Sequence, residues 1–79
     1  MEKQIKRDVY TILKEQFGVN ISVDEKIESL YLLGLMPRDL IRVVFIIENK
    51  YNFQFSKTEL ITTRFDSIDD IILTILQHF

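Results

Sequence analysis

The chain has 79 residues, which is enough for one small domain spanning residues 1–79 and too few for a deep active site beside its own core. Apolar residues make up 47% of the chain, so a packed core is expected, and the net charge of −2 argues against nucleic-acid binding. Cysteine is absent and His78 is the one histidine. This composition excludes disulfides and cysteine metal sites, so we expect neither an enzyme nor a metal-binding protein.

The N-terminal residues are charged and no apolar run follows them, so they do not resemble a signal peptide. No apolar stretch approaches the roughly 20 residues that cross a bilayer. We therefore expect a cytoplasmic monomer that does not bind membranes.

The first predicted helix spans residues 2–17, because its apolar residues recur at helical spacing and Gly18 follows as a C-terminal cap. A long connection over residues 18–36 comes next. Ser22 and Glu25 have capping-box spacing and predict a short helical turn near Val23. The apolar residues of this connection should hold it against the core; they are Ile21, Ile27, Leu30 and Leu33.

A second helix is predicted from Pro37, which suits a first helical turn, to about Tyr51. The β-branched run over residues 41–47 also allows a strand. We favour the helix because of the proline start, the carboxylate of Asp39 in the first turn and the charged ends.

Residues 52–55 alternate in polarity and are expected to be extended. Ser56 with Glu59 predicts a short third helix to about Ile61, and Ser67 with Asp70 predicts a last helix. The inward positions of that last helix are Ile68, Ile71, Ile72, Ile75 and Leu76. Together these elements predict an all-α fold, a small four-helix bundle with a long first loop and a short third helix.

The second helix carries the most informative surface. Arg38, Arg42 and Asn49 share one stripe, Phe45 lies on one flank, and Ile46 and Asp39 lie on the other. Arginine beside an aromatic residue is typical of protein-binding surfaces. We therefore predict a partner-binding face made of Arg38, Asp39, Arg42, Phe45, Ile46 and Asn49. The alternative is that the loop of residues 18–36 covers Phe45.

Other polar groups favour structural roles. His78 follows the last predicted helix, where a positive charge suits the helix dipole, and no ligand set surrounds it. The aspartates near the last helix start lack the glycine and glutamate of a calcium loop; they are Asp66, Asp69 and Asp70. Tyr10, Tyr31 and Tyr51 have no neighbouring base and are expected at the core edge.

The pattern as a whole resembles acyl carrier proteins and related carrier domains. The resemblance rests on the first helix, on the loop ending Leu33-Gly34-Leu35, and on residues 47–55, which resemble the family's Leu-Glu-x-x-Phe-x-x-x-Ile stretch. The segment Ser67-Ile68-Asp69-Asp70-Ile71 resembles the start of the family's final helix. The resemblance implies an acyl-carrier-like four-helix bundle.

The chain differs from the family at the cofactor-attachment site. Carriers read Gly-x-Asp-Ser-Leu there, and the serine carries a 4′-phosphopantetheine arm. This chain reads Gly34-Leu35-Met36-Pro37-Arg38, so Pro37 stands where the serine would be and no phosphodiester can form. Carriers also present an acidic second helix, whereas residues 37–51 here have three basic and two acidic side chains. The expected partner therefore has a neutral or acidic docking patch.

Three functional hypotheses follow. The leading one is a non-enzymatic interaction module without an arm, whose partner is a biosynthetic or peptide-modifying enzyme, since the resemblance extends to carrier-related proteins of bacterial peptide maturation. The second is a working carrier with 4′-phosphopantetheine on another serine, Ser67 or Ser29. Ser67 also fits a helix N-cap, and only 12 residues follow it. The third is a small regulator that binds a ligand between its helices.

Overall fold

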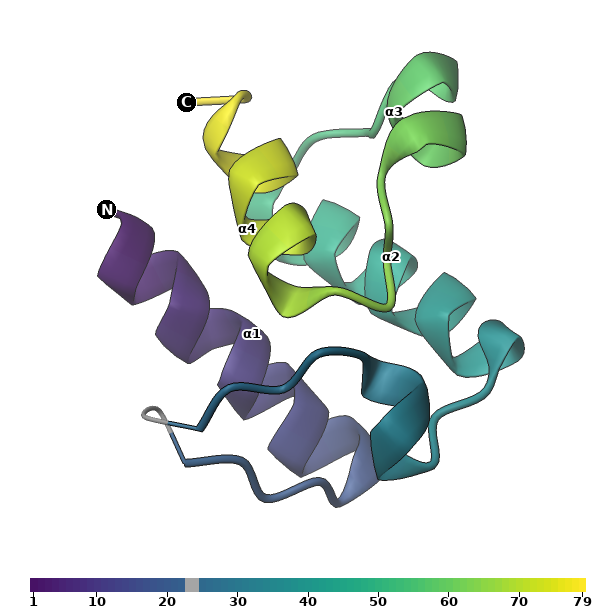
Figure 1. Cartoon of the computed structure of the whole chain (residues 1–79). Coiled ribbons are helices and arrows are strands. Elements are labelled where there is room, and N and C mark those ends of the chain that lie inside the picture. Colours follow the sequence, from purple (N-terminus) through teal and green to yellow (C-terminus); the bar gives the residue numbers. More distant parts are fainter. Residues whose placement is uncertain (23–24) are drawn as a thin grey trace.

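The structure is a computed structural model that describes residues 1–22 and 25–79, and these residues contain helices and irregular segments but no strand (Figure 1). The elements are α1 (Glu2–Phe17), the 3-10 helix η1 (Leu30–Leu33), α2 (Pro37–Tyr51), α3 (Lys57–Thr62) and α4 (Ile68–Leu76). The predicted all-α fold with a long first loop and a short third helix is confirmed. The Cα radius of gyration is 11.6 Å, close to the value of about 12 Å expected for this length.

Local capping residues set the helix ends that the sequence predicts. Gly18 ends α1 with a φ of 69°, a left-handed conformation that glycine adopts without a Cβ penalty. Ser56 and Glu59 form a full capping box at α3, with the Glu59 N–H donating to Ser56 Oγ and the Ser56 N–H donating to Glu59 Oε1. Ser67 Oγ accepts from the Asp70 N–H at the start of α4.

The helical interpretation of residues 41–47 is confirmed, because they lie inside α2. Pro37 occupies the first turn, where its missing N–H costs nothing. The Asp39 carboxylate accepts a hydrogen bond from the Met36 N–H at 2.8 Å. The start of α2 is therefore fixed by a proline and a carboxylate.

Two connections differ from the prediction. Asn52 is not extended: its φ of 57° is left-handed and ends α2, with its N–H donating to the Glu48 carbonyl. The helix η1 was not predicted; Ser29 caps its start, and Gly34 ends it with a φ of 92°. The predicted turn near Val23 falls on residues 23–24, which lie outside the described residues.

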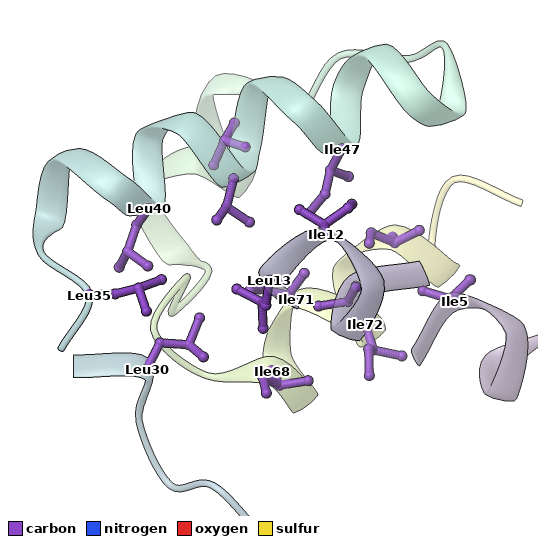
Figure 2. Packing of buried hydrophobic residues seen from close by; sticks show 14 of the residues in the cluster. Ile5, Ile12, Leu13, Leu30, Leu35, Leu40, Ile47, Ile68, Ile71 and Ile72 are labelled. Carbon is purple, nitrogen blue, oxygen red and sulfur yellow. The ribbon is translucent and has the colours of Figure 1, made fainter. Parts of the chain in front are cut away.

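The core lies where α1 packs against both α2 and α4. In Figure 2, leucine and isoleucine side chains from α1, the long loop, α2 and α4 point into one shared interior. Its fully buried members are Leu13, Leu30, Ile47, Ile71, Ile75, Val9 and Val43. The long loop is pinned as predicted: Leu30 is buried, and Ile21, Ile27 and Leu33 pack against the core.

Polar contacts join distant segments around this core. Asp66, in the α3–α4 connection, accepts a hydrogen bond from Ser29 Oγ at 2.7 Å, and its carbonyl accepts from the Leu30 N–H at 2.7 Å. Tyr51 at the end of α2 donates to the Asp8 carboxylate of α1 at 2.6 Å. The long loop is thereby tied to the α3–α4 connection, and the end of α2 is tied to α1.

The two leucines of η1 provide a matched test of how the loop is held. Leu30 is fully buried, so Leu30→Ala should lower the free energy of unfolding by about 2–5 kcal/mol through lost burial and a cavity. Leu32 is 74% exposed, so Leu32→Ala should change it by less than about 0.5 kcal/mol. Urea denaturation of both variants measures the difference. Equal losses would show that the loop does not pack as described.

Candidate protein-binding surface

An open apolar groove of about 600 Å³ runs between α2 and the segment made of Leu60 of α3 and the α3–α4 connection. Its α2 wall consists of Pro37, Leu40, Ile41, Val44, Phe45 and Glu48. The opposite wall and the end are formed by Leu60 of α3, Thr63, Arg64, Phe65 and Asp66 of the α3–α4 connection, and Tyr31 of η1. In Figure 1, α3 stands apart from the α1 side of the bundle, beyond α2 and α4. The groove is a surface feature and not part of the packed core, because Ile41, Phe45 and Leu60 on its walls are exposed.

The apolar character of the groove comes from α2, which has more large apolar side chains than its inner face can bury. Leu40, Val43, Val44 and Ile47 are buried against the bundle. Ile41 and Phe45, one helical turn apart, are 57% and 59% exposed. The loop of residues 18–36 thus leaves Phe45 accessible, so the alternative in which it covers Phe45 is wrong.

The six residues predicted for the partner-binding face are not equally available. Arg38, Arg42, Phe45 and Asn49 are exposed. The Arg42 guanidinium lies over the Phe17 ring of α1, 5.2 Å from its centroid. Asp39 is half-buried and caps α2, and Ile46 is half-buried and packs against the core. The accessible part of the predicted face is therefore the outer side of α2 around Phe45, which we call the crest of α2 and which carries Arg38, Arg42, Phe45 and Asn49.

Ile41, Tyr31 and Leu60 were missed as surface residues. Ile41 lies four residues before Phe45, so helical spacing alone placed it beside that residue. Tyr31 was expected at the core edge, yet it is 47% exposed and lines the groove. No local sequence pattern marks Leu60 as a residue of the groove, because its place there depends on where α3 packs.

The α3 wall is held mainly by polar contacts, since α3 has no buried residue. His78 Nε2 lies 2.9 Å from Glu59 Oε2, and the hydroxyls of Thr63 and Thr74 lie 3.0 Å apart. The His78 ring stacks on Phe53 with centroids 4.1 Å apart. The Ser56 backbone N–H and His78 hold the pKa of the Glu59 carboxyl below its usual value. His78 thus links α3 to the segment that follows α4, a contact that the sequence did not predict.

Charged side chains of both signs lie in and around the groove. In the described part of the chain the ion pairs are Arg64–Asp66 and His78–Glu59, and Arg38 and Arg42 take part in neither. The nearby carboxylates have internal partners: Glu48 accepts from the Phe55 N–H at 2.9 Å. Hydrogen bonds from Ser29 and Arg64 lower the pKa of the Asp66 carboxyl. The groove lining itself carries the carboxylates of Glu48 and Asp66 and the guanidinium of Arg64, whereas Arg38 and Arg42 lie on α2 outside that lining.

The candidate attachment residues are engaged in local structure. Pro37 has no hydroxyl, Ser67 Oγ accepts from the Asp70 N–H, and Ser29 Oγ donates to Asp66. Among residues 1–22 and 25–79, no three His, Asp or Glu side chains gather as a metal site. No helix within those ranges has the length and apolar character to cross a membrane.

Comparison of the sequence with protein-family models and with curated proteins finds no match, and comparison of the fold with solved structures finds none either. The resemblance to acyl carriers therefore stays a prediction from the sequence.

Lowering the pH should weaken the contacts that hold α3 in place, because these contacts depend on the ionised Glu59 carboxylate. Because the pKa of Glu59 is lowered in the folded chain, its contribution to stability is present above the ordinary glutamate pKa of about 4.3 and is lost as pH falls through the folded value. Wild type should therefore exceed Glu59→Gln in free energy of unfolding at about pH 6, and the gap should close towards about pH 3. Urea denaturation across this range checks it, with the exposed Glu15→Gln as control. A gap that stays constant with pH would contradict the assigned contacts.

Proposed function

We propose that this chain is a non-enzymatic, acyl-carrier-like interaction module without a phosphopantetheine arm, which presents α2 to a partner protein. The observation that carries the proposal is the exposure of Ile41 and Phe45 beside a groove and next to Arg38 and Arg42. Large contiguous apolar patches are uncommon on small monomeric proteins and mark interaction sites. Aromatic and arginine side chains are those that contribute most at interfaces.

The acyl-carrier-like part of the proposal is supported by the order of elements. A first helix, a long packed loop, a second helix that starts at the attachment position, a short third helix and a final helix follow one another as in carriers. Pro37 begins α2 at that position and offers no hydroxyl. The helix start is thus preserved while the chemistry of attachment is lost.

The partner is proposed to be a biosynthetic or peptide-modifying enzyme with a neutral or acidic docking patch. Its class follows from the resemblance to carrier-related proteins of bacterial peptide maturation. Its charge follows from the exposed cations of α2, which would repel the basic patch that receives an ordinary carrier.

The openness of the groove favours a protein over a small ligand. A pocket for a small molecule usually buries most of the ligand surface. Here Ile41, Phe45 and Leu60 are all roughly half exposed, so a small apolar ligand would keep much of its own surface in water. A partner protein would cover both the groove and the crest of α2.

Photo-crosslinking in the native cell tests the proposal. A photoreactive amino acid replaces Phe45 on α2, and in a matched variant it replaces Leu73, which is 56% exposed on α4. We expect a defined protein to crosslink from position 45 and not from position 73. The crosslinked protein is then identified and purified for binding measurements.

With that purified protein, Phe45→Ala should weaken binding at least about tenfold, whereas Leu73→Ala should change it less than about twofold. Equal crosslinking from both positions, or an affinity that Phe45→Ala leaves unchanged, would refute docking through α2.

A further inference from the structure

We infer that residues 56–64, which contain α3, form a flap that swings away from the groove while the rest of the bundle stays folded. Two polar contacts, Glu59–His78 and Thr63–Thr74, form the latch that holds the flap closed. The inference goes beyond the proposed function, because it concerns the chain alone and holds whether or not a partner binds α2.

The flap is attached through a polar inner face. Among residues 56–64, all of which the structure describes, Glu59 and Thr63 are the two side chains that are not exposed. They are four residues apart and therefore lie on the same side of the helical segment. The large apolar side chains of α3, Leu60 and Ile61, are 47% and 73% exposed. Hydrophobic burial thus contributes less to the attachment of this segment than to that of α1, α2 and α4.

The two side chains of the inner face are the ones that form the latch. Both carboxylate oxygens of Glu59 lie 2.9 Å from His78 Nε2. The hydroxyl oxygens of Thr63 and Thr74 lie 3.0 Å apart. Thr74 belongs to α4, and the His78 N–H donates to the Ile75 carbonyl in the turn that follows α4. The latch therefore joins one side of the flap to one end of α4.

The groups that receive the flap are held by the bundle itself. The His78 ring stacks on Phe53 with centroids 4.1 Å apart. Thr74 is buried, and its hydroxyl donates to the Asp70 carbonyl at 2.9 Å, so Thr63 is the donor in the contact between the two threonines. Opening the flap therefore breaks the latch and leaves these positions in place.

The two ends of the flap meet at one fixed point. The Phe55 and Phe65 rings pack edge to face with centroids 5.4 Å apart. Phe55 is 5% exposed and its N–H donates to the Glu48 carboxylate, while Asp66 accepts from Ser29 Oγ. A surface segment whose ends lie close together can move as a unit without displacing either end. The flap is therefore hinged on either side of residues 56–64.

Opening the flap changes the groove. Leu60, Thr63 and Arg64 line the groove and would leave it together, whereas Phe65 and Asp66 would remain. The Arg64–Asp66 ion pair crosses the hinge and adds little resistance, because the Arg64 side chain is 65% exposed. The width of the groove is therefore controlled by the latch.

Hydrogen exchange of the purified full chain, followed by NMR at one pH, tests the inference. A released helix of six residues does not persist in water, so the Leu60 and Thr63 amides exchange whenever the flap opens. The amides of the buried Leu13 and Ile47 exchange when the bundle unfolds. We expect protection of the flap amides to be at least about 100-fold lower, with little dependence on low urea concentrations. Flap amides with the protection and urea dependence of the core amides would overturn the inference.

Matched threonine variants locate the latch, with the Leu60 amide as the readout. Thr63→Val should raise the opening of the flap about fivefold, because it removes one contact of the latch. Thr62→Val should change it less than about twofold, because that hydroxyl donates to the Thr58 carbonyl within the flap. Equal effects of the two substitutions would contradict the latch.

A second variant removes the other contact of the latch. His78→Phe keeps a ring that stacks on Phe53 and loses the nitrogen that contacts Glu59. Combined with Thr63→Val, it should raise the opening at least about tenfold in total. A combined variant that opens no more than wild type would show that these contacts do not hold the flap.

A core variant separates opening of the flap from unfolding of the bundle. Val9 on α1 is fully buried, so Val9→Ala should speed exchange of the Leu13 and Ile47 amides at least about fivefold. The Leu60 amide should change less than about twofold, because Val9 is not part of the latch. Equal acceleration of the core and flap amides would show that α3 unfolds only with the bundle. This outcome is independent of whether any protein crosslinks from position 45.

Discussion

The packing of α2 is the constraint on which the rest of the structure depends. This helix must bury one face against the bundle, and Leu40, Val43, Val44 and Ile47 are sufficient for that. Ile41 and Phe45 then remain on the outside, because one turn of a helix cannot direct every side chain inward. The short α3, with no buried residue, stands beside them without covering them. A groove with an apolar wall is the direct consequence.

The same helix explains why the resemblance to acyl carriers leads to a different proposal. Pro37 is well suited to begin a helix and unable to carry a phosphodiester, so the proposed carrier-like module would lack the arm. Arg38 and Arg42 give the crest of α2 the opposite charge from the one that carriers present. Binding is the function that its surface supports best.

Sequence reasoning predicted the parts of the fold that local interactions determine. Gly18, Ser56 and Ser67 fixed helix ends because a cap depends on residues within one turn. The helix η1 was missed, since Ser29 is held by Asp66, 37 residues away. The exposed Phe45 was predicted from helical spacing, but Ile46 and Asp39 proved to be half-buried. The groove itself could not be predicted, because it requires the position of α3, which contacts between distant residues determine.

The central claim is that this chain acts as a binding module and carries no acyl arm. The most direct test is the intact mass of the purified chain after incubation with coenzyme A and a broad-specificity phosphopantetheinyl transferase. The account predicts an unchanged mass, because Pro37 lacks a hydroxyl and those of Ser29 and Ser67 serve local structure. A mass gain of one pantetheinyl group, abolished by Ser67→Ala or Ser29→Ala, would contradict it and identify a working carrier.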